Sequence, residues 1–172
     1  MAKSIPERNM MKIKNLILPI ALIGGLAAFS SPSFSAEPVF GGTDDVVFAQ
    51  RLWNALERHH LVGDNAINVY PFIGNQPHGA IQQVLDTNIK LLGKKSRVIV
   101  KRNHGGPNAN VKSVFADPDK HLKAVTVMFK REAGYDEDNL NWFWVKYTPD
   151  GQLDKNPKGM KLAGRVAKGA NK

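Results

Sequence analysis

The chain has 172 residues, of which 24 are basic and 15 acidic, and it contains no cysteine. The absence of cysteine excludes disulfides, thiolate metal sites and thiol catalysis in this sequence. The basic excess lies in the N-terminal segment and in residues 151–172, whereas residues 37–150 are close to neutral. This distribution argues against nucleic-acid binding through a basic face of the fold.

Residues 11–36 have the composition of a secretory signal peptide. Lys12 and Lys14 form a short basic region, an apolar run covers residues 16–29, and small and polar residues follow up to Ala36. This order of basic, apolar and small residues is typical of a cleaved export signal. The apolar run is shorter than the ~20 residues that a membrane-spanning helix needs.

We therefore expect residues 1–36 to be removed and residues 37–172 to remain as a single domain. Translation is expected to start at Met10 or Met11, because the residues before them add a charged leader without evident use. The mature domain is then periplasmic or secreted and has no stable membrane anchor. An uncleaved membrane anchor is the alternative.

The first predicted element of the mature chain is a helix over residues 44–56. Asp44 and Asp45 lie at its start, where the helix dipole favours acidic groups, and apolar residues follow at spacings of three to four. Residues 65–78 contain two prolines and predict a loop.

Strands are predicted next, at residues 80–87 and 89–92, with a turn at 93–95. Residues 97–102 contain three consecutive β-branched residues between basic ones, which is typical of a strand. A turn-rich loop is expected over 103–108 and a helical turn over 111–115.

The strongest pair of predicted strands covers residues 122–130 and 141–147, joined by a polar connection. A turn follows at 149–151, where proline precedes glycine. Residues 160–168 are expected to form a short basic helix. The predicted fold class is α+β, with a mostly antiparallel β-sheet, an N-terminal helix, a short middle helix and a C-terminal basic helix.

The second strand of that pair is rich in aromatic residues. Strand alternation places Trp142, Trp144 and Lys146 on one face and Phe143, Val145 and Tyr147 on the other. A sheet covered on both faces explains this pattern, and it is the interpretation that the pattern alone favours. A sheet with one face in the core and one lining a pocket for a flat ligand is the alternative.

Histidines are the candidate metal ligands of this chain, which has five, at positions 59, 60, 78, 104 and 121. No two of them have a recognised ligand spacing, so surface or capping roles are favoured over a metal site. His78 and His104 stand beside glycines in predicted loops and are the two worth following. The acidic residues 136–138 lack the calcium-loop pattern and indicate a solvated connection.

Three segments resemble the P-460 cytochrome family. Residues 125–151 are similar to the C-terminal half of that family, and residues 153–169 are similar to the segment that leads into its haem motif. Residues 97–101 resemble its strand-plus-lysine element. The resemblance implies a periplasmic, mostly antiparallel domain, often a homodimer, that covers one face of a c-type haem.

The resemblance also implies a function. Family members attach haem through a Cys-x-x-Cys-His sequence; some carry a lysine cross-linked to the haem and oxidise hydroxylamine, whereas others bind nitric oxide or similar small molecules. Lys101 is the position closest to the cross-linking lysine. The expected partners are a small-molecule ligand or a redox partner, and whether the protein is an enzyme stays open.

The haem motif itself is missing from this sequence. One explanation is a chain truncated before the motif, which the abrupt basic end favours; the other is a relative that has lost haem. Without cysteine, the chain cannot hold haem through thioethers. A haemless periplasmic small-molecule binding or scaffold protein that retains the fold is therefore the alternative function.

The sequence places a pocket between the 97–101 strand and the pair of strands that follows. Lys101, Phe129 and Trp144 are the residues expected to line it, with His78 and His104 on nearby loops. No metal ligand is assigned.

Overall fold

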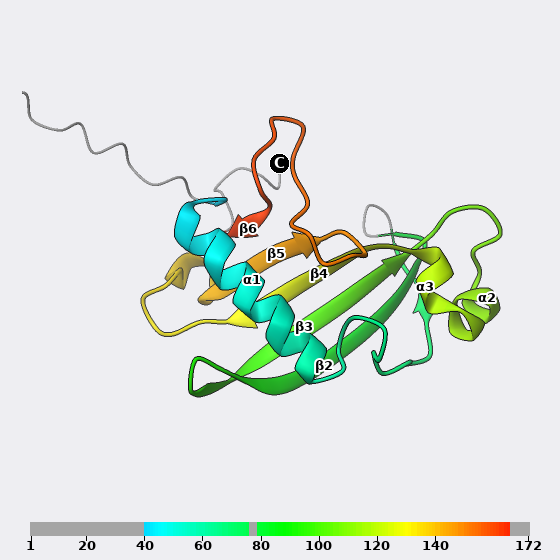
Figure 1. Ribbon diagram of the computed structural model, residues 1–172, viewed down its shortest axis with the longest axis horizontal. Coiled ribbons are helices and arrows are strands. Elements are labelled where there is room, and N and C mark those ends of the chain that lie inside the picture. Colours follow the sequence, from blue (N-terminus) through cyan, green and yellow to red (C-terminus); the bar gives the residue numbers. More distant parts are fainter. Residues whose placement is uncertain (1–39, 76–78, 166–172) are drawn as a thin grey trace, which may run out of the picture. The chain divides into compact units, whose positions relative to one another are not determined.

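The computed structural model describes residues 40–75 and 79–165. Its framework is a single sheet of six strands, in which every strand pairs antiparallel with the next one along the chain. The helix α1 lies across one face of this sheet, and two short helices lie near one end of it (Figure 1). The predicted α+β class with a mostly antiparallel sheet is confirmed.

The helix α1 (Thr43–Arg58) matches the predicted N-terminal helix. It carries Asp44 and Asp45 in its first turn and ends at Arg58; His59 is its C-cap, and His60 after it adopts a positive φ of 55°. One side of the helix is apolar and buried, and its members are Ala49, Leu52, Trp53, Ala55 and Leu56.

The long hairpin of the sheet differs in detail from its prediction. After the two-residue strand β1 (Phe72–Ile73), the strands β2 (Ile81–Leu91) and β3 (Lys94–His104) each run for eleven residues. Their turn is formed by Leu92 and Gly93, both with positive φ, as a tight hairpin turn requires. The predicted turn at 93–95 is therefore one residue too late, because Lys94 and Lys95 already pair with β2.

The middle of the chain follows the prediction of a short helix. The helix α2 (Val111–Ala116) begins with a capping box between Asn110 and Ser113, and α3 (Pro118–His121) follows directly. The strand β4 (Leu122–Lys130) then pairs with β5 (Trp142–Tyr147), and the connection between them contains the short helix η1 (Glu137–Asn139).

The predicted C-terminal basic helix is wrong over residues 160–165. These residues instead form a bridge between Lys155 and Lys161 and the strand β6 (Ala163–Gly164), which pairs with β5. The amide of Lys146 donates to Leu162 O at 2.9 Å, so pairing supplies partners to β5, which would otherwise be an open edge. Residues 166–168 of the predicted helix lie outside the described residues.

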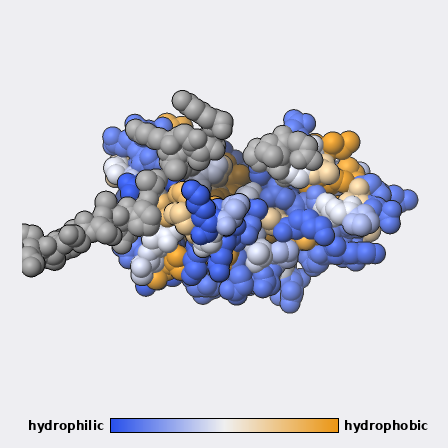
Figure 2. Space-filling model, turned by 90° about the horizontal axis from the view of Figure 1, so that it is seen from above, coloured by the Kyte–Doolittle hydropathy of each residue, from blue (hydrophilic) through white to orange (hydrophobic). Residues whose placement is uncertain are grey.

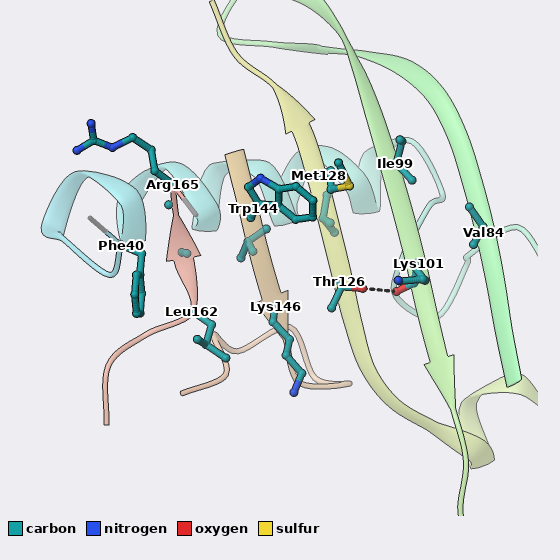
Figure 3. Close-up of a pocket in the computed structure, with 14 residues that line it drawn as sticks. Phe40, Val84, Ile99, Lys101, Thr126, Met128, Trp144, Lys146, Leu162 and Arg165 are labelled. Carbon is teal, nitrogen blue, oxygen red and sulfur yellow. Dashed lines mark hydrogen bonds between the residues drawn. The ribbon is translucent and has the colours of Figure 1, made fainter. Parts of the chain in front are cut away.

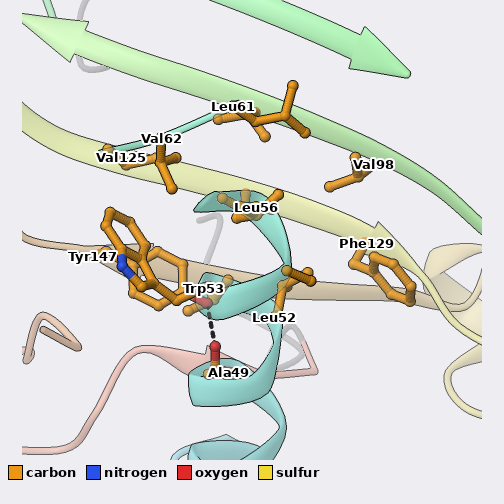
Figure 4. Packing of buried hydrophobic residues seen from close by; sticks show 14 of the residues in the cluster. Ala49, Leu52, Trp53, Leu56, Leu61, Val62, Val98, Val125, Phe129 and Tyr147 are labelled. Carbon is orange, nitrogen blue, oxygen red and sulfur yellow. Dashed lines mark hydrogen bonds between the residues drawn. The ribbon is translucent and has the colours of Figure 1, made fainter. Parts of the chain in front are cut away.

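The core lies between α1 and the face of the sheet that it covers (Figure 4). Valines of β3 and β4 and the aromatic rings of Phe129, Phe143 and Tyr147 form the sheet side of this core. The hydroxyl of Tyr147 donates to Ala49 O at 2.7 Å, which ties α1 to β5 inside the core. Within the described residues, no helix is long and apolar enough to cross a membrane.

The packing of α1 on the sheet gives a test of the fold. Leu52 is fully buried, so we expect Leu52→Ala to lower the free energy of unfolding by about 2–5 kcal/mol through lost burial and a cavity. Arg51→Ala, at an exposed position of the same helix turn, is the matched control. Urea unfolding followed by circular dichroism measures both, and equal effects of the two substitutions would contradict this packing.

Candidate binding site on the open face of the sheet

The face of the sheet opposite α1 carries a pocket of about 420 Å³. In Figure 3 the helix passes behind the strands, and the labelled side chains of the pocket stand on the near side. Each strand contributes alternate residues to this face. Those that line the pocket from β2 to β5 are Val84, Ile99, Lys101, Thr126, Met128, Trp144 and Lys146.

The pairing of the strands places these residues in two rows. Lys101 pairs with Val84 on one side and with Thr126 on the other, and Thr126 pairs with Lys146. In the second row, Ile99 pairs with Met128 and Met128 with Trp144. One row is therefore mainly apolar, and the row beside it carries two amines.

Trp144 is the largest side chain of the pocket, and it is 38% exposed, although its neighbours Phe143 and Val145 are buried. The prediction that Trp142, Trp144 and Lys146 share one face is confirmed by the burial pattern of β5. Of the two interpretations of that pattern, the structure supports the pocket, because α1 covers only the opposite face. Elsewhere, Figure 2 shows a mainly hydrophilic surface with apolar areas that are separate from one another.

The charges around the pocket are unequally paired. Lys146 forms an ion pair with Asp154 at 2.8 Å, and its hydrogen bond lowers the pKa of that carboxyl group. Lys101 has no ion pair among the described residues. Its ammonium group is therefore free to meet an anionic group of a ligand, and the exposed Arg165, which also lines the pocket, has no ion pair within the same described part of the chain.

Trp142 is on the same face but in a different environment. The Lys130 ammonium lies 5.3 Å from the centre of its ring, and the Arg97 guanidinium lies at 6.0 Å. These cation–π contacts occupy the ring. Trp144, without such a contact among the described residues, remains available to a ligand.

Only some of the residues predicted for the pocket line it. Lys101 and Trp144 line it, as expected. Phe129 does not: it is 5% exposed, pairs with Phe143 and belongs to the core on the other face. His78 lies outside the described residues.

His104 was expected on a loop, but it ends β3 and is 1% exposed, on the face that α1 covers. Its Nδ1 lies 3.1 Å from Pro118 O and its Nε2 lies 3.1 Å from Gln83 Oε1. Gln83 in turn donates to Asn68 Oδ1 at 2.8 Å. This cluster connects the loop before β1 to the sheet, and it has no contact with the pocket.

The sequence pattern alone does not identify the other residues that line the pocket. Val84, Ile99 and Met128 stand at alternate positions of three strands, so their common face follows only once the strand register is known. Leu162 and Phe40 also line the pocket. They come from segments in which the sequence predicted a helix or no element.

The buried histidine predicts a pH dependence of stability. Burial lowers the pKa of His104 from 6.5 to about 4; Pro118 O opposes this shift, and the nearby Arg102 and His121 add to it. Between these two pH values the unfolded chain binds a proton that the folded chain does not. The contribution of His104 to the free energy of unfolding is therefore fully present above pH 6.5. It declines by about 2–3 kcal/mol as the pH falls toward 4.

Urea unfolding of the protein and of His104→Gln at several pH values measures this contribution, and His59→Gln is the control at an exposed position. We expect the difference in stability between the protein and His104→Gln to shrink on acidification. A difference that grows instead would mean that the two carbonyl oxygens hold a charged imidazolium.

The face is open and mainly apolar and has amines at its border, which are features that one flat side of a haem and its carboxylate groups would need. It does not supply an attachment: the chain has no cysteine, and no histidine lines the pocket among the described residues. Those residues also contain no group of three or more side chains that could hold a metal ion. Comparison with protein-family models, curated proteins and solved structures finds no match to this chain.

Proposed function

We propose that the open face of the sheet binds a haem-like tetrapyrrole and that the chain is a P-460-like haem domain. The observation that carries this proposal is an apolar pocket lined by the exposed ring of Trp144 and by Lys101, whose ammonium has no ion pair within residues 40–75 and 79–165. An apolar surface with a few fixed charges is the usual form of a cofactor site. The resemblance of residues 97–101 and 125–169 to the P-460 family supports the same class of ligand.

Each part of the pocket has a distinct role in this proposal. Ile99, Met128 and Trp144 provide the surface that excludes water from one side of the ring. Lys101 pairs with a carboxylate of the ligand, and it is also the residue that the resemblance associates with the cross-linking lysine. A bound haem supplies the redox chemistry, and the protein supplies the surface, orientation and charge around it.

The proposal includes the cell compartment. Residues 1–36 act as an export signal, and the domain works in the periplasm or outside the cell with a small-molecule ligand or a redox partner. Covalent attachment of haem is not part of it, because the sequence offers no thiol.

A second candidate is a haemless protein that binds another flat, anionic molecule at the same face. The absence of histidine from the described lining favours it, since a non-covalent haem commonly needs an imidazole as its axial ligand. Both candidates share the pocket and Lys101, and they differ in whether the ligand contains iron.

Haemin titration of the full chain tests the proposal, with binding followed by the Soret band. We expect Ile99→Glu to weaken binding by about tenfold or more, because the ligand would bury a carboxylate without a partner. Ile73→Glu is the matched control, since Ile73 is 78% exposed on β1, away from the pocket. Lys101→Gln should weaken binding by roughly two- to fivefold, the range of an exposed ion pair, and Lys90→Gln should not.

Equal affinities of the chain, Ile99→Glu and Ile73→Glu for haemin would contradict binding at this face. The same variants are then titrated with anilinonaphthalene sulfonate, a flat anionic dye without iron. If the chain binds the dye but not haemin, and Ile99→Glu abolishes the binding of the dye, the haemless candidate is supported.

A further inference from the structure

A second cavity, of about 170 Å³, lies on the face of the sheet that α1 covers. It is lined by β3 and β4, by α1, by the segment after α1 and by α3. Arg102 reaches it from β3, next to Lys101 of the open face, because successive residues of a strand point to opposite sides. The two cavities are therefore on opposite faces of the sheet.

Arg102 is the unusual residue of this cavity. It is 3% exposed, and one terminal nitrogen donates to the carbonyl of Ile67, but its Nε is buried without a hydrogen-bond partner. No ion pair joins it within the described residues. A guanidinium stays charged in proteins, so a buried one without an anionic partner is costly.

Two acidic residues also line the cavity, and both are exposed. They are Asp64, in the segment after α1, and Asp119, in α3. Burial lowers the pKa of Arg102 and the charge of Asp119 raises it, although the two groups form no direct ion pair. The cavity thus has a buried cationic side and an acidic side toward solvent.

The rest of the lining is mainly apolar and includes Trp53, Val62, Leu122 and Val125. The size of the cavity limits what fits, since an engineered apolar cavity of about 150 Å³ holds a benzene molecule. A simple anion would be opposed by the two carboxylates, and a simple cation would be opposed by Arg102. A small molecule with both charges satisfies the two sides at once.

We propose that this cavity binds a small zwitterion of the α-amino acid class, with its carboxylate against Arg102 and its ammonium toward Asp64 and Asp119. The terminal nitrogen of Arg102 that does not bond to Ile67 then donates to a carboxylate oxygen, a charge-assisted bond of the stronger kind. A short side chain faces the apolar lining. This site shares no lining residue with the open face and does not rest on the function proposed for that face.

Calorimetric titration of the full chain with L-alanine and L-serine tests the site, and acetate and ethylamine each present only one of the two charges. We expect the amino acids to bind and each half-ligand to bind roughly tenfold more weakly. Asp119→Asn should weaken alanine binding by roughly two- to fivefold, the range of an exposed ion pair. Glu137→Gln, at an exposed position far along the chain in η1, should leave it unchanged.

Arg102→Lys retains the charge but loses the planar group, and we expect it to abolish measurable alanine binding. Should that variant not fold, the double variant Asp64→Asn/Asp119→Asn decides, because both positions are exposed. Acetate that binds as tightly as alanine, and equally to the double variant, would overturn the zwitterion site in favour of a simple anion site. A titration in which neither amino acid releases or absorbs heat would also overturn the zwitterion site, and the cavity would then contain solvent alone.

Discussion

The apolar side of α1 packs against one face of a six-stranded antiparallel sheet, and the described part of the chain places no comparable element on the other. One helix of this length covers a single face. The strands that cross under it nevertheless carry large apolar residues on both faces, Phe143 toward the helix and Trp144 away from it. The pocket results from this mismatch, because an apolar face that no helix covers lowers its free energy by burying its surface against something else.

Much of this arrangement can be predicted from the residues. Alternation in β5 identifies the two faces, and the acidic start and the apolar spacing identify α1. Lys101 and Trp144 both line the pocket of the open face, although they lie in different rows and two strands apart. Assigning Phe129 to the pocket fails on register: Phe129 pairs with Phe143 and Met128 with Trp144. A difference of one residue moves a strand's side chains to the other face, and the long connection between β4 and β5 does not fix the register by its composition.

The other failures have physical causes of the same kind. Apolar residues at 160–168 satisfy a helical spacing, but β5 needs a partner, and the hydrogen bond from Lys146 N to Leu162 O favours a strand. Gly164 also approaches Phe40 so closely that an added Cβ would stand 2.9 Å from its Cα. His104 stands beside two glycines, which suggested a loop, yet the ring is buried between Pro118 and Gln83. Such contacts join segments distant in the chain and leave no local pattern.

Lys101 and Arg102 are neighbours in β3 and line two different cavities. A pair of basic residues at the end of a strand suggests that both side chains are in solvent. Lys101, on the open face, follows this expectation. Arg102 is instead buried, because the segment after α1 lies over the strand and the carbonyl of Ile67 in that segment accepts a hydrogen bond from the guanidinium. The charge is thereby buried beside a cavity rather than in solvent. Since the strand backbone separates the two side chains, a ligand bound at one face would not contact the cation of the other face.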